Sequence, residues 1–230
     1  MNNFFIIGHR GARGEKFENS LSGFKYALTL DIDAIELDIR QHSGELWVIH
    51  DHELERLTGS TGRFDEAIDP SKLRLLNNEP IPRLREVLDL FWGKLPVNIE
   101  IKSFDTVSLL LELLDQYPVI EQDSNFPWIL ISSFDHRQIR DLRNRSCPWG
   151  LALLTGGIPI NTRQLIDEIK PFSWNMKDEY VDYSFIEQIQ RQGVRVMIYT
   201  VNKMHRAVSL RNGGIDGIFT DYPSSLANID

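Results

Sequence analysis

Short apolar runs alternate with amphipathic stretches along almost the whole chain. Nine runs have the length and composition of strands, and stretches with apolar residues three and four apart follow most of them. The nine runs lie at residues 4–10, 34–40, 46–51, 97–102, 128–134, 150–155, 172–177, 194–202 and 214–221. Repeated strand–helix units within one domain length predict a parallel sheet covered by helices.

One of these predicted strands cannot lie parallel to the strand before it. Only the residues QHSGE separate 34–40 from 46–51, whereas a parallel crossover needs about a dozen residues or more. We therefore expect an antiparallel hairpin with Ser43 and Gly44 at its turn. Eight parallel strands remain, and the sequence predicts an α/β fold, a TIM (β/α)8 barrel with a hairpin and insertion after the second strand.

The chain is long enough for one barrel domain over residues 1–230. It has 230 residues, of which 42% are hydrophobic, and such a chain can bury one large core. We place an insert at about 45–83, whose least regular part, 53–83, is dense in Gly, Asn, Pro and charge. This part fits a lid or insert near a functional site and, equally, a flexible surface loop.

Charge and cysteine content narrow the class of partner and compartment. The net charge of −8 argues against nucleic acid or an anionic membrane surface as the main partner. The single cysteine, Cys147, allows no intrachain disulfide, and we interpret it as a packing residue. The chain shows no signal-peptide pattern and no apolar run near the ~20 residues that span a bilayer. We expect a cytoplasmic protein without a transmembrane segment.

Carboxylates occupy one face of two predicted barrel strands. Because side chains alternate along a strand, Glu36 and Asp38 share a face, as do Glu100 and Lys102. Charges on the inner face of a barrel are costly unless they are paired or bound to a metal. Oxygen ligands favour Mg²⁺ or Ca²⁺, with Mn²⁺ a further candidate. The alternative is a structural ion pair with Lys102 or Arg40, and the spacing supports both hypotheses equally.

Two histidines follow apolar runs and strengthen the metal hypothesis. His9 ends the first predicted strand beside Arg10, and His50 ends the hairpin strand beside Asp51. Active sites of TIM barrels lie at the carboxyl ends of the strands. Two histidines can serve as general base and general acid near neutral pH, and Arg10 and Lys102 suit a phosphate. With a divalent metal, this set describes metal-assisted phosphoester hydrolysis.

Eight segments, in this order, resemble the glycerophosphodiester phosphodiesterase family. They are GHRGARGEKFENS, IELDIR, WVIHD, IPRLREVL, NIEIK, SSF, YTVN and DGIFTDYP, from about His9 to Pro223. The resemblance implies a TIM barrel that hydrolyses glycerophosphodiesters, small-molecule substrates, to an alcohol and sn-glycerol 3-phosphate. The residue roles it implies are acid and base for His9 and His50, metal ligands for Glu36, Asp38 and Glu100, and phosphate contacts for Arg10 and Lys102.

Some segments depart from the family pattern. FENS stands where the family usually has PENT, so Phe17 and Ser20 replace a proline and a threonine. Ser20 can still cap the following helix, whereas loss of the proline is expected to loosen the loop. We interpret Glu18 as a residue that supports the ligands rather than as a ligand. Tyr199 replaces a tryptophan in YTVN, which bears on how the alcohol packs.

Three aromatic residues are candidates for the substrate pocket. The aromatics are Phe134, Trp174 and Tyr199, with core packing as the alternative for each.

Two other functions fit the predicted site as a whole. A lysophospholipase D or sphingomyelinase D activity would need an apolar groove or exposed apolar loops, and no such segment stands out. An inactive barrel that binds a phosphorylated metabolite is the other function. The sequence leaves open the alcohol head group, the metal, the oligomeric state and whether water or the substrate's glycerol hydroxyl attacks phosphorus.

Overall fold

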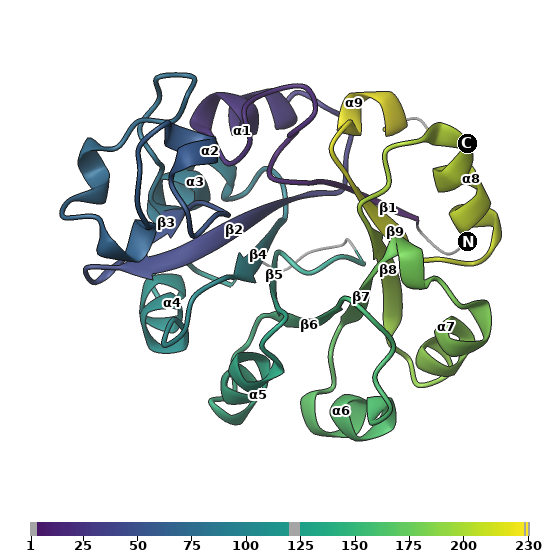
Figure 1. Ribbon diagram of the computed structural model, residues 1–230. Coiled ribbons are helices and arrows are strands. Elements are labelled where there is room, and N and C mark those ends of the chain that lie inside the picture. Colours follow the sequence, from purple (N-terminus) through teal and green to yellow (C-terminus); the bar gives the residue numbers. More distant parts are fainter. Residues whose placement is uncertain (1–3, 120–124, 228, 230) are drawn as a thin grey trace.

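The computed structural model describes residues 4–119, 125–227 and 229, and in it eight parallel strands close into a ring (Figure 1). The strands are β1 (Phe5–Gly8), β2 (Ala34–His42), β4 (Val97–Ile101), β5 (Ile129–Ser133), β6 (Gly150–Thr155), β7 (Ser173–Lys177), β8 (Arg195–Tyr199) and β9 (Gly217–Thr220). Each pairs in parallel with the next, and β9 and β2 both pair with β1, which closes the barrel. The predicted TIM barrel is confirmed.

The predicted hairpin is also present. β3 (Glu45–Val48) pairs antiparallel with β2, from His42 opposite Glu45 to Ile39 opposite Val48. At the turn Ser43 and Gly44 have φ angles of 52° and 75°, the left-handed conformation that a tight hairpin turn needs. β3 therefore lies outside the ring, and the chain after it is free to reach the mouth of the barrel.

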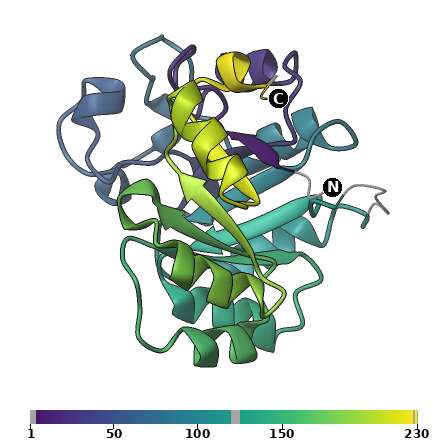
Figure 2. The ribbon, with the colours of Figure 1, turned by 90° about the vertical axis from the view of Figure 1, so that its right-hand side faces the viewer.

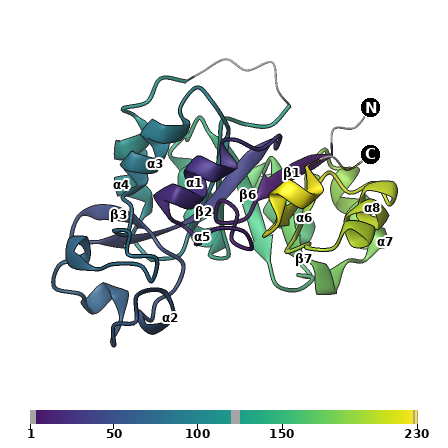
Figure 3. The ribbon, with the colours of Figure 1, turned by 90° about the horizontal axis from the view of Figure 1, so that it is seen from above.

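Helices follow the barrel strands and cover the outside of the ring. They are α1 (Leu21–Ala27), α3 (Leu84–Phe91), α4 (Val107–Leu114), α5 (His136–Asn144), α6 (Thr162–Ile169), α7 (Tyr183–Gln190), α8 (Met204–Asn212) and α9 (Pro223–Leu226). Ser20 caps α1, since its Oγ accepts from the Gly23 N–H at 3.0 Å. Figure 2 shows α7 and α8 outside the strands, and Figure 3 shows α9 beside β1.

Two apolar layers support the barrel, and they leave one end of its interior polar. The outer layer fills the space between strands and helices and includes Cys147, which is buried there as expected. A smaller cluster fills the interior with Phe5, Ile7, Ala34, Phe126, Leu130, Ala152, Met197 and Phe219. Because residues two apart on a strand share a face, Glu36 and Asp38 follow Ala34 up the inner wall. The charged residues thus gather at the carboxyl ends of the strands.

The segment after β3 packs around a small core of its own, on the side of the barrel that holds β3 (Figures 1 and 3). It contains α2 (Glu55–Thr58) and two 3₁₀ turns, Phe64–Glu66 and Pro70–Lys72. We call its apolar residues the insert cluster: Trp47, Ile49, Leu54, Leu57, Phe64, Leu75 and Ile81. Seven buried apolar side chains favour a packed insert over a flexible loop. The assignment of residues 1–230 to one domain stays a prediction.

Phe17 lies against this cluster, which differs from the expectation for the loop before α1. We expected loss of the family proline to loosen the loop. Instead the Phe17 side chain packs on the insert cluster, while the Asn19 N–H donates to the Arg10 carbonyl at 3.1 Å. The aromatic ring thus supplies a tertiary contact that ties the loop to the insert.

No helix in the described part of the chain is both long enough and apolar enough to span a bilayer.

A pair of substitutions tests whether the insert is packed. Phe64 is buried in the insert cluster, whereas Ile68, four residues on, is fully exposed. We expect Phe64→Ala to lower the free energy of unfolding by about 3 kcal/mol through the lost burial and the cavity left behind. Ile68→Ala should change it by less than about 0.5 kcal/mol. Equal unfolding free energies for the two variants in urea titrations would contradict the packed insert.

Candidate active site

Three buried carboxylates meet at the mouth of the barrel. Asp38 on β2 stands opposite Glu100 on β4 in the strand register, and Glu36 stands opposite Asn98. One oxygen from each of Glu36, Asp38 and Glu100 lies within 4.8 Å of the others. We call these three residues the carboxylate triad. The structure thus brings together the three residues that the sequence proposed as metal ligands.

Two cations lie beside the triad but do not balance it. Lys102 hydrogen-bonds Glu100, and its Nζ lies 3.3 Å from Asp38 Oδ1. Arg10 Nε lies 3.2 Å from Asp38 Oδ2. Arg40 turns away, because its guanidinium donates to the carbonyls of His50 and Lys102. The ion-pair alternative therefore holds in part, for Lys102. If all three carboxylates were ionised, their charge would exceed that of the two cations.

Glu36 has the least compensation of its charge among the three carboxylates. It accepts from the Arg10 backbone N–H at 2.9 Å, and among the described residues its nearest ion-pair partner is His9 Nε2, at 3.9 Å. Glu36 Oε1 and Asp38 Oδ1 are buried without a hydrogen-bond partner. Buried carboxylate oxygens that lack partners are costly, and a divalent cation would satisfy both of them.

The pKa values of the triad residues also favour a bound divalent cation. Burial, together with the charges of Asp38 and Glu100, raises the pKa of Glu36 well above its ordinary value. Burial also raises the pKa of Glu100, to about 7. Burial opposes ionisation of Asp38 as well, but Lys102 and Arg10 outweigh it and hold the pKa of Asp38 below its usual range. The triad therefore fits a divalent metal ion, whose binding would displace the protons.

His9 is held by a carboxylate from the other end of the chain. Its Nδ1 lies 2.6 Å from Oδ1 of Asp221, which directly follows β9. Asn202 donates to the second oxygen of Asp221 at 2.8 Å. Because the carboxylate accepts the Nδ1 proton, Nε2 of a neutral His9 is left with its lone pair on the side of Glu36. Burial lowers the pKa of His9, which favours the neutral form.

His50, which follows β3, has a similar partner. Its Nδ1 lies 2.7 Å from Oδ1 of Asp51, and its side chain is partly exposed. Burial lowers the pKa of His50, while the charge of Asp38 and the hydrogen bond to Asp51 oppose that shift. The Ile49 N–H donates to the Asp38 carbonyl at 3.0 Å, which holds this segment against β2. Each histidine thus has one nitrogen fixed and one free.

A tight turn after β1 places Arg10. Arg10 has a positive φ of 50°, and a Cβ at Gly8 would lie 2.2 Å from the Gly11 carbonyl oxygen, so only glycine fits at that position. The Arg10 guanidinium is buried and donates to Glu18 Oε1 at 2.7 Å. Glu18 therefore contacts Arg10 and lies outside the carboxylate triad.

Phe134 and Tyr199 line the small cavity beside the triad, whereas Trp174 does not. Their rings meet edge to face with centroids 6.0 Å apart, and Lys102 Nζ lies 5.5 Å from the centre of the Phe134 ring. The cavity is lined by His9, Glu36, Asn98, Glu100, Phe134, Leu154, Tyr199 and Phe219. Trp174 lies in the outer core and donates to Thr155 Oγ1 at 3.0 Å. Trp174 is therefore a core residue, which is the alternative that the sequence left open.

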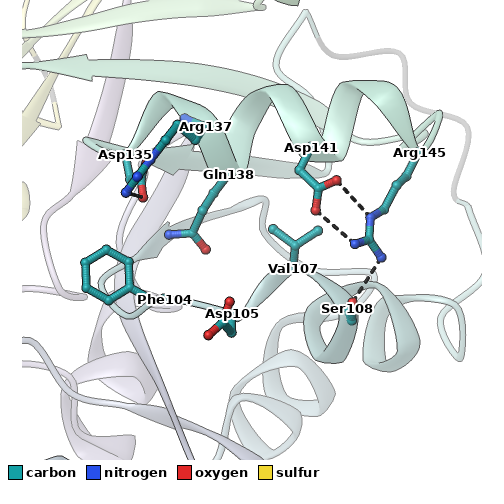
Figure 4. Close-up of a pocket in the computed structure, with 9 residues that line it drawn as sticks. All are labelled: Phe104, Asp105, Val107, Ser108, Asp135, Arg137, Gln138, Asp141 and Arg145. Atoms are coloured by element: carbon teal, nitrogen blue, oxygen red, sulfur yellow. Dashed lines mark hydrogen bonds and ion pairs between the residues drawn. The ribbon is translucent and has the colours of Figure 1, made fainter.

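A second hollow borders the loops after β4 and β5. It is bordered by α4, α5 and the loops before them, as Figure 4 shows, and Phe104, Gln138 and Arg145 are among its lining residues. Arg145 spans its edge, with contacts to Asp141 and to Ser108. None of the proposed site residues lines it.

Sequence reasoning missed Asp221 and Arg56. Asp221 stands in the segment DGIFTDYP, after the last strand, which a closed barrel must place beside the first strand and so beside His9. The closure of the barrel, which the sequence predicts, is thus enough to place Asp221 near His9. Arg56 lies in the irregular insert and contacts both Glu18 and Asp51, and no periodic pattern marks it.

The fold and site define a TIM barrel with a cluster of buried carboxylates at its mouth that could hold a metal ion. The model of the glycerophosphoryl diester phosphodiesterase family matches residues 9–225. A glycerophosphodiester phosphodiesterase of Caldanaerobacter subterraneus subsp. tengcongensis is 30% identical over 97% of this chain and 96% of its own. A lysophospholipase D of Mus musculus is 33% identical over 96% of this chain and 84% of its own.

The chain therefore belongs to the glycerophosphoryl diester phosphodiesterase family. A solved structure agrees in fold. This is a phosphodiesterase of Oleispira antarctica in complex with the product sn-glycerol-3-phosphate, with a TM-score of 0.88 over 98% of this chain and 96% of that one, at 22% identity.

Stability measurements with and without metal test the triad. Because Glu36 and Glu100 have raised pKa values, their stabilising contribution is present below the ordinary carboxylate pKa and is lost as pH rises through the raised values. A metal replaces those protons, so the rise in melting temperature on adding Mg²⁺, Mn²⁺ or Ca²⁺ should be larger at about pH 8 than at about pH 5. At 100 times Kd the gain is about 2.7 kcal/mol.

Two variants show whether the triad is responsible. Glu36→Gln keeps the shape but removes a ligand charge, and it should abolish most of the metal-induced stabilisation. Glu112→Gln, an exposed position on α4, is the matched control and should respond like the unmodified protein. A metal response that is equal in both variants would place the cation elsewhere.

Proposed function

We propose that this protein hydrolyses glycerophosphodiesters to an alcohol and sn-glycerol 3-phosphate, using a divalent metal ion held by Glu36, Asp38 and Glu100. The observation that carries the proposal is the buried triad, whose charge when ionised exceeds that of Arg10 and Lys102 and in which two oxygens lack hydrogen-bond partners. The names of the relatives and the product bound in the Oleispira antarctica structure support the same reaction.

Each charged group of the site has a task in this proposal. The metal, with Mg²⁺ or Ca²⁺ first and Mn²⁺ as a further candidate, would act as a Lewis acid on the phosphoryl oxygens. Arg10 and Lys102 bind the phosphate and stabilise the charge that builds on it. Both already lie beside the triad, so a phosphate held by them would lie next to the proposed metal position.

The two histidines move the protons. His9 accepts a proton at Nε2 from the nucleophile, because Asp221 occupies its Nδ1. His50 donates a proton from Nε2 to the leaving alcohol, because Asp51 occupies its Nδ1. The nucleophile is water or the substrate's own glycerol hydroxyl, which would pass through a cyclic phosphate. Both routes use the same proton donor for the alcohol.

The other assignments follow from this proposal. Phe134 and Tyr199, beside the triad, form an apolar wall for one arm of the diester. We also propose one barrel domain over residues 1–230 and a cytoplasmic location, which the free, buried Cys147 supports.

Replacement of His50 tests the proton donor. We expect His50→Ala to lower kcat by about 100-fold or more with glycerophosphocholine as substrate, the usual size of general acid–base catalysis. His205→Ala, at an exposed position on α8, is the matched control and should keep full activity. Near-normal turnover by His50→Ala, with an unchanged circular dichroism spectrum, would remove His50 from the mechanism.

Metal removal tests the reaction itself. EDTA should abolish the hydrolysis of several glycerophosphodiesters, and Mg²⁺, Mn²⁺ and Ca²⁺, each added back, should restore it to different extents. This result would also exclude an inactive barrel that only binds a phosphorylated metabolite. Turnover that EDTA leaves unchanged would contradict the metal-dependent mechanism.

Hydrolysis of lysophospholipids is a second candidate, and a structural observation favours it. The sequence showed no apolar segment near the site, but Phe104, Phe134, Ile158 and Ile160 are exposed on the loops after β4, β5 and β6. These loops border the mouth of the barrel, where an acyl chain would lie. The mouse relative is a lysophospholipase D. A higher kcat/KM for a lysophospholipid than for glycerophosphocholine would favour this substrate class.

A further inference from the structure

Arg56, on α2 of the insert, holds two acidic residues at once. Its guanidinium donates to both oxygens of Glu18, from Nη1 to Oε2 and from Nη2 to Oε1, each at 2.8 Å. It also donates to both oxygens of Asp51, from Nε to Oδ2 at 2.5 Å and from Nη2 to Oδ1 at 2.9 Å. A planar guanidinium can make two such paired contacts, whereas an ammonium group cannot.

Each of these carboxylates also hydrogen-bonds a different residue of the proposed site. Glu18 accepts from Arg10 Nη1 at 2.7 Å, and Arg10 is the proposed phosphate contact. Asp51 bonds His50 Nδ1 at 2.7 Å, and His50 is the proposed proton donor. In the part of the chain that the structure describes, Arg56 is the one side chain whose hydrogen bonds and ion pairs reach both Glu18 and Asp51.

The insert holds Arg56 in place from both sides. The next residue, Leu57, and nearby Leu54 are buried in the insert cluster. On the other side Phe17, immediately before Glu18, packs on the same cluster. The insert cluster thus sets the spacing between Glu18 and the helix that carries Arg56.

We propose that Arg56 is a positioning residue for catalysis: through Asp51 it sets the orientation of His50, and through Glu18 it sets that of Arg10. The insert then belongs to the catalytic machinery and is more than a cover over the barrel. This inference rests on the proposed function, because it assigns Arg56 to the proton donor and phosphate contact of that reaction.

Two substrates separate the two effects of Arg56. Glycerophosphocholine releases an alkoxide that needs a proton, whereas the 4-nitrophenyl ester of sn-glycerol 3-phosphate releases a phenolate that does not. We expect Arg56→Lys to lower kcat for glycerophosphocholine by about 10- to 100-fold, the scale of a misplaced catalytic group. The kcat for the nitrophenyl ester should fall less, because its leaving group needs no proton and only the contribution of Arg10 is disturbed. KM should rise for both substrates, because both depend on Arg10.

Three further variants complete the test. Asp51→Asn should reproduce the loss of kcat, and Glu18→Gln should reproduce the rise in KM. Arg145→Lys is the matched control, because Arg145 has the same side-chain exposure of 46% and also pairs with a carboxylate, Asp141, away from the site (Figure 4). It should leave kcat and KM unchanged for both substrates.

The outcomes distinguish this inference from the proposed function. If the unmodified protein is active, an Arg56→Lys variant that loses kcat equally on both substrates, or on neither, overturns the positioning role. If the unmodified protein hydrolyses neither diester, the proposed function fails. Calorimetric binding of sn-glycerol 3-phosphate then tests Arg56 alone: we expect a weaker Kd for Arg56→Lys than for Arg145→Lys, and an equal Kd overturns the inference.

Discussion

The burial of three carboxylates against two cations is the constraint on which the rest of this site depends. Glu36, Asp38 and Glu100 are held too close together to ionise freely without a counter-charge. Arg10 and Lys102 supply part of that counter-charge, and the three carboxylates could also hold a metal ion. The two cations are also the groups that bind phosphate in the proposed reaction. In the proposed reaction, one charge balance would thus determine where metal and substrate bind.

The barrel lowers the free-energy cost of these buried charges by keeping them apart from the apolar core. Residues such as Ile7, Ala34 and Phe219 fill the lower interior, so the charges are confined to the carboxyl ends of the strands. Ring closure then brings Asp221, which follows the last strand, to His9, which follows the first. The insert brings Arg56 to Glu18 and Asp51, the acidic partners of Arg10 and His50. Both histidines are therefore oriented by segments outside the triad.

The period-2 alternation of strands explains why much of this was predictable from the sequence. Alternation placed Glu36 and Asp38 on one face, and the short QHSGE link required the hairpin. Contacts that depend on packing between distant segments were not predictable in the same way. Arg56 lies in a segment without periodicity, and Phe17 packs on a cluster that forms only after the insert folds. Trp174 has the composition of a pocket residue, but its strand turns it toward the helices.

The most direct test of this account is to locate a metal ion by anomalous scattering from a crystal soaked in Mn²⁺. We expect a peak bonded to oxygens of Glu36, Asp38 and Glu100, at about 2.0–2.6 Å from each. We also expect Lys102 to move away from Glu100 or to share that carboxylate with the metal. No anomalous peak at the triad at saturating Mn²⁺, with the triad still paired to Arg10 and Lys102 alone, would contradict it.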